Sequence, residues 1–394
     1  MLKRTKIRIG IGSVAACALV AGALTTAFAA GHGSGSSSSS SSSSSWNPNI
    51  VTSTTTIKNI SSTVPSTGDL NPYGVATIPS SIGHLTRGYE LVTNYNNKSN
   101  LNGTGASIIE INPATGQKTL FAWLTQSTMP SQCPGGIGLT SSIVVLKNGW
   151  VIVSSLPTSD GTSKTAKAGC LIVINSLGHA KAVLSGSWLN GPWGMTAVDN
   201  GNNVQLFVTS VLNGTAGHWN QVRNTATVIR INLSVTRQTF RVRTIVIIAS
   251  GLPTKLSTAS FIQAPTGLVI VGNRLFIVDN LNNRIIFVNF ATTRFSSAGT
   301  GFTLTRGGLL SSPLIIIVFR GTLLVTNSGN GNLIAISLSG RTSLVKALST
   351  TSTSGSAPGA DALWGMAPSL NGQWIYYAND LSNTLNAVGP LQSS

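Results

Sequence analysis

The sequence predicts an all-β fold, a six-bladed β-propeller closed by a strand from the N-terminal side of the domain. Three observations support this prediction. A short glycine-containing motif recurs along the chain, apolar runs rich in Val, Ile and Thr follow each copy, and no segment carries a sustained apolar stripe of helical period. With 41% hydrophobic residues among 394, the chain can bury a full core, which excludes disorder throughout.

Each repeat begins with the glycine-containing motif, at the start of its first strand. The clear copies are Asn71–Val75, Gly191–Met195, Ala264–Leu268 and Ala362–Met366, and the degenerate copies are Gly135–Gly138 and Ser312–Ile315. A second apolar run follows and ends in a small polar residue, at Asn94, Ser155, Ser210, Asn280, Asn327 and Asn379. The third runs are Ser107–Asn112, Cys170–Asn175, Thr227–Asn232, Arg284–Asn289, Asn332–Ser337 and Thr384–Val388. Five repeats have a fourth run, at Lys118–Trp123, Lys181–Leu184, Gln238–Ala249, Phe302–Thr305 and Thr342–Ala347.

The sixth repeat ends the chain after three strands, so its blade lacks an outer strand. The β-branched run Ile50–Ile57 precedes the first repeat and can supply that strand. Closing the ring in this way removes the exposed edges that an open sheet would leave. Two separate β-domains are the alternative arrangement.

The fourth repeat carries a recognisable motif. Ala264–Leu268 contains Pro-x-Gly, Arg274–Asn280 is an apolar run that ends in Asp-x, and Asn282–Ile286 contains Asn-Arg-Ile. This repeat resembles an NHL repeat, and the other five match only loosely. The resemblance implies a six-bladed propeller used for ligand or protein binding, distantly similar to calcium-dependent lactonases of the gluconolactonase and paraoxonase kind and to streptogramin lyase. Because such folds host unrelated functions, the resemblance does not settle the activity.

Residues 1–29 have the pattern of a signal peptide. Lys3–Arg8 is basic, residues 9–26 are mostly apolar, and Ala27–Ala29 has the small-x-small pattern of a signal-peptidase site. An uncleaved membrane anchor and a lipoprotein modified at Cys17 are the alternatives. Residues 30–48 contain an unbroken run of serines and are predicted to form a flexible linker. The propeller domain is then expected over residues 49–394.

Charge and export together indicate where the protein works. The net charge is +17, with only 8 acidic residues. The basic residues are scattered, so we expect no nucleic-acid partner. Carboxylates lose their charge in acid, and the scarcity of acidic residues therefore favours an acid-adapted protein that is secreted or periplasmic. We expect a monomer that touches a membrane only if its N-terminal segment stays uncleaved.

First-strand starts and second-strand ends lie on the same face of an antiparallel propeller. Tyr73, Trp193 and Trp364 stand at such starts, so we expect them to share that face with the polar second-strand ends. The aromatic rings either stack on a flat ligand or pack between blades. The polar ends either stabilise the turns or present oxygens to a polar ligand or a cation.

Long loops join the second and third strands of repeats one to three, at residues 95–106, 156–169 and 211–226. They carry Lys98, Lys164, Lys167, His218, Trp219 and Arg223. Loops on a rigid scaffold are common binding sites, so we expect a positively lined pocket for an anionic ligand, with solvated insertions as the alternative. The predicted ligand-binding residues are Tyr73, Trp193, His218, Trp219, Arg223 and Trp364.

A calcium site is a second hypothesis for this face. Its candidate ligands are Asn280, Asn327, Asp361 and Asp380, and it would suit a calcium-dependent lactonase or esterase. Protonation of the carboxylates in acid would weaken it. No G-x-S-x-G, H-E-x-x-H or P-loop motif occurs, so the sequence identifies no catalytic residue and predicts no cofactor other than this calcium.

Cys133 and Cys170 remain once the N-terminal segment is set aside. Both are expected on the loop face of repeat two, where an exported protein favours a disulfide. Two unpaired thiols are the alternative.

The expected function is an exported binding or interaction module, with a small-molecule or protein ligand on the face that bears the long loops of blades 1–3. A calcium-dependent hydrolase on the same scaffold is the alternative. A structural envelope protein held on the serine linker is a third possibility.

Overall fold

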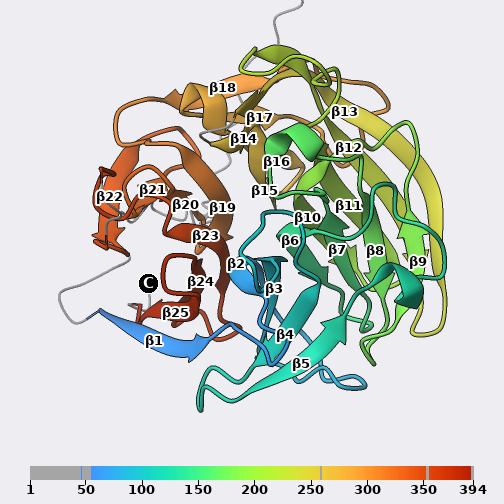
Figure 1. Ribbon diagram of the computed structural model, residues 1–394. Helices are drawn as coiled ribbons and strands as arrows, with labels where there is room; N and C mark the ends of the chain where they lie inside the picture. The colour runs from blue at the N-terminus through green and yellow to red at the C-terminus, as the bar shows by residue number, and fades with distance from the viewer. Residues whose placement is uncertain (1–45, 47–54, 258–259, 352–354, 392–394) are drawn as a thin grey trace, which may run out of the picture. The chain divides into compact units, whose positions relative to one another are not determined.

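The computed structural model describes residues 46, 55–257, 260–351 and 355–391. Within them six sheets surround a common centre, as Figure 1 shows. The chain is therefore a six-bladed β-propeller, as predicted. The expected signal peptide, the serine linker and the predicted strand residues 50–54 lie outside the described residues.

Each blade is an antiparallel sheet whose strands follow one another from the centre to the rim. The innermost strands are β2 (Leu70–Thr77), β6 (Leu139–Val145), β10 (Pro192–Asn200), β15 (Pro265–Val271), β19 (Pro313–Phe319) and β23 (Leu363–Pro368). The second strands are β3 (Glu90–Asn96), β7 (Val151–Ser155), β11 (Asn203–Ser210), β16 (Arg274–Asp279), β20 (Thr322–Asn327) and β24 (Ile375–Asn379). The third strands are β4 (Ser107–Ile111), β8 (Cys170–Ile174), β12 (Arg223–Val235), β17 (Arg284–Val288), β21 (Asn332–Ile336) and β25 (Thr384–Gly389). The outer strands are β5 (Lys118–Trp123), β9 (Ala180–Leu184), β13 (Phe240–Ser257), β18 (Phe302–Arg306), β22 (Thr342–Ala347) and β1 (Thr56–Ser62).

The outer strand of the last blade comes from the beginning of the domain. β1 pairs antiparallel with β25, from Thr56 opposite Gly389 to Ser62 opposite Thr384. Ring closure is thus as predicted, but the strand extends beyond the expected residues 50–57 to Ser62. Its inward-packing residue is Ile60, which lies against the apolar cluster between the sixth and first blades. The pairing register shifts between Asn59 and Ser61, on either side of Ile60.

The hydrophobic core is divided among the blade interfaces. A separate cluster of buried side chains lies between each pair of neighbouring blades, so the second and third strands are covered on both faces. This double burial explains why their sequences are continuous apolar runs instead of alternating ones. A seventh cluster, around Tyr73 and Trp193, lies beneath one end of the central channel.

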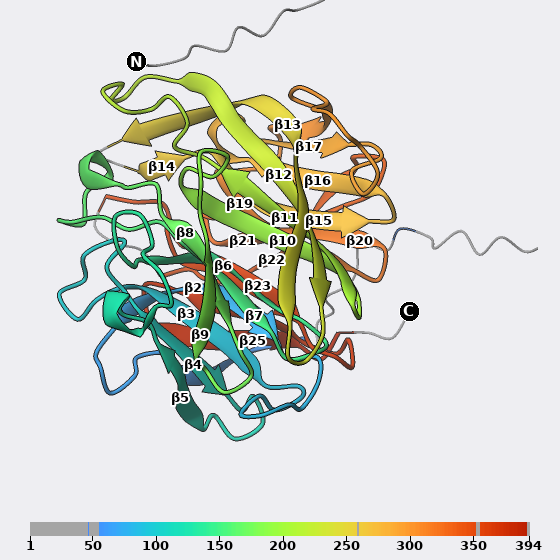
Figure 2. The same cartoon turned by 90° about the vertical axis from the view of Figure 1, so that its right-hand side faces the viewer.

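Two departures from regular blades occur on the face where the first strands start. β12 and β13 form a hairpin with strands of 13 and 18 residues, the longest pair in the side view of Figure 2. β13 continues past its blade and pairs with β14 (Phe261–Gln263), so this sheet has five strands. The loop between β11 and β12 is shorter than the expected residues 211–226, because Arg223 already pairs with Thr254.

Helical structure is confined, in the described part of the chain, to three single turns of 3₁₀-helix. These are η1 (Gln126–Thr128), η2 (Ser163–Thr165) and η3 (Asn280–Asn282). None of the described helices has the length and apolarity that a membrane crossing requires.

Candidate functional site

A cavity of ≈ 440 Å³ opens where the innermost strands begin, around the central axis. Residues from the starts of β2, β10, β19 and β23 line it, together with part of the loop between β7 and β8 and the region around β14. Tyr73, Trp193 and Trp364, which were expected to share a face, all line this cavity.

Five aromatic side chains form the wall and floor of the cavity: Tyr73, Tyr95, Trp193, Phe261 and Trp364. Tyr73 stacks on Trp364 with ring centroids 3.9 Å apart, and it meets Trp193 edge-on at 5.6 Å. Tyr95 contacts Phe261 edge-on at 5.9 Å. The rings therefore pack on one another, as aromatic pairs prefer, and also present surface to the cavity.

The blade repeat explains why three aromatic residues meet there. Tyr73, Trp193 and Trp364 each follow the residue that pairs with the end of their blade's second strand. A glycine comes next in each case, and a Cβ at Gly194 would lie only 1.6 Å from the carbonyl oxygen of Thr266. The glycine lets neighbouring innermost strands approach closely, which brings the rings together at the axis.

Two buried polar atoms that line the cavity have no hydrogen-bond partner among the described residues. They are the hydroxyl of Tyr95, whose residue is 1% exposed, and Oδ1 of Asn71, at 7%. Asn71 has φ +61°, and its backbone N–H donates to Oδ1 of Asn383 at 2.7 Å. Sequence reasoning missed both residues, although Asn71 opens the first repeat motif and Tyr95 directly follows Asn94.

The charged groups of the cavity are the carboxyls of Asp361 and Asp380. Burial is the main cause that raises the pKa of Asp380, and the charge of Asp361 raises it further. The Trp364 indole lowers it, and the resulting pKa is about 7. Burial also raises the pKa of Asp361. These carboxyls also affect the Tyr73 hydroxyl. Its pKa is raised well above the ordinary value, mainly by burial and then by the charges of Tyr95, Asp380 and Asp361. The two carboxyls thus lie beside the aromatic rings, with Asp380 half-buried and Asp361 more exposed to solvent.

The structure places the predicted loop residues outside this cavity. No Lys, Arg or His from the described ranges lines it, so the expected positive lining is absent there. His218 is exposed, with Nδ1 3.2 Å from Oε1 of Gln221, and Trp219 packs against the cluster beneath the cavity. Arg223 is the first residue of β12. None of these three residues lines the cavity, although Trp219 packs against the same cluster that holds Tyr73 and Trp193.

The polar second-strand ends mainly hold neighbouring loops. Asn94 donates through Nδ2 to the carbonyl of Thr63 and to Ser107 Oγ, and Ser155 Oγ accepts the N–H of Gly138. Asn327 donates through Nδ2 to the carbonyl of Leu309. The turn-stabilising interpretation therefore describes these side chains.

Blade 4 differs by one residue from the expected register. Asp279, not Asn280, pairs with the first residue of β15, Pro265. Asp279 Oδ2 forms an ion pair with Arg284 Nε at 2.5 Å, and its side chain is fully buried. Asn280 lines the cavity, and its Nδ2 donates to the carbonyl of Pro313 at 2.9 Å.

Of the four candidate calcium ligands, Asn280, Asp361 and Asp380 line the cavity, whereas Asn327 does not. Within the described part of the chain, no three His, Cys, Asp or Glu side chains come together as a metal-binding group. Calcium takes about six to eight oxygen ligands, and these three side chains supply only part of such a set.

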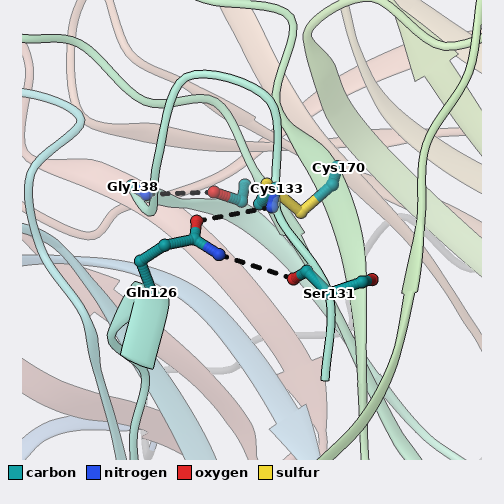
Figure 3. Close-up of a disulfide and its surroundings, with 6 residues drawn as sticks. Gln126, Ser131, Cys133, Gly138 and Cys170 are labelled. Carbon is teal, nitrogen blue, oxygen red and sulfur yellow. Dashed lines mark hydrogen bonds between the residues drawn. A yellow bond between two sulfur atoms is a disulfide. The ribbon is translucent and has the colours of Figure 1, made fainter. Parts of the chain in front are cut away.

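A disulfide supports one wall of the cavity. Cys133 and Cys170 are bonded, with sulfurs 2.06 Å and Cα atoms 5.4 Å apart, as Figure 3 shows. This pairing confirms the prediction. The N–H of Gly169 also donates to the carbonyl of Pro134 at 3.0 Å. The bond therefore anchors the end of the loop that contributes residues 161–163 to the cavity.

Comparison with known proteins extends the fold assignment. No family model matches the chain, and no curated protein matches it. Virginiamycin B lyase from Staphylococcus aureus is similar with TM-score 0.50 and 14% identity, over 85% of this chain and 99% of that one. Regucalcin from Agrobacterium tumefaciens, a calcium-binding protein, has TM-score 0.51 and 11% identity over 84% and 94%. A gluconolactonase from Xanthomonas campestris is similar with TM-score 0.53 and 11% identity, over 85% of this chain and 89% of that one. At these identities the similarity shows the propeller fold alone, in agreement with the expected distant relationship.

Proposed function

We propose that this protein is an exported binding module that holds a small molecule in the central cavity. The observation that carries the proposal is a cavity of ≈ 440 Å³ lined by five aromatic rings and a few convergent polar groups. Small-molecule sites are typically concave, mostly apolar, and about 300–1,000 Å³ in volume.

Export is supported by two features outside the cavity. The N-terminal segment has the pattern of a signal peptide, and the blade 2 cysteines form a disulfide. Disulfides persist mainly in oxidising compartments, such as the periplasm or the exterior of a cell.

The test is binding of a panel of small molecules, measured by thermal shift and then by calorimetry. Thr162→Trp places a large ring at the exposed rim of the cavity, and Ser159→Trp is the matched control on the same loop outside the lining. We expect ligands to bind the wild type and the control, and to lose most affinity in Thr162→Trp and in Trp364→Leu. Unchanged binding in both cavity variants would contradict the proposal.

A second candidate function is a calcium-dependent hydrolase of lactones or esters. Two carboxyls and the Asn280 amide around one cavity favour it, and a calcium-binding protein and a gluconolactonase share the fold. Lactone turnover that a chelator abolishes and Asp361→Asn removes would establish this function in place of simple binding.

A further inference from the structure

The charge around the central cavity has one sign. Asp361 and Asp380 line it, and none of the Lys, Arg or His side chains within the described ranges does. The protein as a whole carries +17, so the acidic lining is opposite to the charge of the molecule. A ligand anion would meet two carboxyls with no basic side chain beside them, which disfavours binding.

Aromatic surface adjoins these carboxyls. The indole of Trp364 affects the ionisation of Asp380, and both carboxyls affect that of Tyr73, so all four side chains lie close together. Trp364 is only partly buried, although it stacks on Tyr73 and packs against the apolar clusters on both sides of its blade. It also lines the cavity, so part of the indole faces that space. Aromatic rings beside carboxylates attract organic cations through the ring quadrupole and through direct charge.

We propose that the ligand is an organic cation, an ammonium group attached to an apolar or aromatic body. The ammonium lies beside Asp361, Asp380 and Trp364, and the body lies against Tyr95 and Phe261. This inference rests on the proposed function, because it names the ligand class of the same cavity. A bare metal ion would use the carboxyls and leave the five rings without a role.

Three probes that share a phenyl ring test the charge requirement: benzyltrimethylammonium, benzyl alcohol and benzenesulfonate. We expect the full-length folded protein at pH 8 to bind the cation about tenfold or more tightly than the neutral probe, and the anion most weakly. Calorimetry gives all three affinities. Equal affinity for cation and neutral probe would overturn the inference, as would failure of the cation to bind at millimolar concentration.

Variants locate the binding. Asp361→Asn/Asp380→Asn should remove the preference for the cation, while Asp199→Asn, which removes a charge from the end of β10 outside the cavity lining, should keep it. Circular dichroism and melting curves would show that each variant is folded. A preference that survives in the double variant would overturn the inference.

Failure of this inference can be distinguished from failure of the proposed function. If another small molecule binds the wild type and loses affinity in Thr162→Trp, the cavity is a binding site for a ligand that is not a cation. Binding of Ca²⁺ alone, abolished in the double variant and not competed by the ammonium probe, would also refute the organic-cation assignment.

Discussion

Asp279 in blade 4 and Asp380 in blade 6 lie at the ends of second strands on the same face, but one has a basic neighbour and the other an acidic one. In blade 4, Asp279 is fully buried and forms an ion pair with Arg284, and Asn282 also donates to it at 3.0 Å. In blade 6, Asp380 directly follows β24 and lines the cavity, where its charged neighbour is a second acid, Asp361.

The difference separates a structural carboxyl from a candidate binding carboxyl. A buried charge that is paired and hydrogen-bonded is compensated inside the fold, and removing its partner group is costly. Among the described residues Asp380 has no ion-pair partner. Only the Trp364 indole favours its ionised form, and burial, with the charge of Asp361, moves its pKa to about 7. Strongly shifted groups in a cleft are candidates for function, which is the role proposed for this residue.

The largest expected effect comes from breaking the blade 4 pair. Asp279→Ala leaves Arg284, whose side chain is 14% exposed, without its ionic partner. We expect the free energy of unfolding to fall by about 3 kcal/mol, measured by urea denaturation at pH 7. Asp199→Ala is the comparison variant: this half-buried carboxylate near the end of β10 accepts the N–H groups of Lys147 and Gly201 but forms no ion pair, so its loss should cost less. A loss below about 1 kcal/mol would show that the pair contributes little.

A change of opposite sign is expected in blade 6. The raised pKa of Asp380 means that the folded state binds a proton between the ordinary value of 3.8 and about 7. Its contribution to stability is therefore complete below about pH 4 and lost as the pH rises through 7. Asp380→Asn should raise the free energy of unfolding by about 1 kcal/mol or more at pH 8 and have little effect at pH 3.5. Destabilisation of equal size at both pH values would refute the assignment.

The smallest effect is expected at a third kind of carboxyl, which is buried and has no ionic partner. Burial raises the pKa of Glu90 well above its usual value, and a hydrogen bond from Thr77 acts against this shift. The Thr77 hydroxyl donates to the Glu90 oxygens at 2.8–2.9 Å, and the carbonyl of Pro368 lies within hydrogen-bond distance of the same hydroxyl at 2.9 Å.

Glu90→Gln keeps an acceptor for Thr77 at the same place and should change the free energy of unfolding by less than about 0.5 kcal/mol at pH 7. Glu90→Ala, which leaves the Thr77 hydroxyl without this acceptor and opens a void, is the contrasting control. A large loss in the Gln variant, seen by urea denaturation, would indicate that Glu90 is ionised in the folded protein.

Much of the fold was predictable because its signals are local. Glycine-marked strand starts, apolar runs and turn residues recur within each blade, and they located the third strands to within a few residues apart from the extended β12. The disulfide was also predictable, since both cysteines belong to one repeat. The closing strand was predicted at Ile50–Ile57. Residues 50–54 lie outside the described part of the chain, and composition did not show that the strand continues past Ile57 to bring Ile60 against the core.

The site was only partly predictable. Tyr73, Trp193 and Trp364 were correctly placed together, because equivalent positions of a repeat converge at its axis. Phe261 was not singled out, because it comes from β14, which no other blade has. The basic loop residues were expected at the pocket, but loop sequence does not reveal whether a side chain turns toward the axis.

The sequence by itself determined the repeat, the number of blades, the origin of the closing strand and the cysteine pair. These follow from patterns that neighbouring residues impose on one another. The tertiary structure decided the sign of the cavity's charge and the burial of its acids. Both depend on groups from opposite ends of the domain, such as Asn71 and Asp380, which meet only when the ring closes. A pKa near 7 is a property of that shared space, and no single segment carries it.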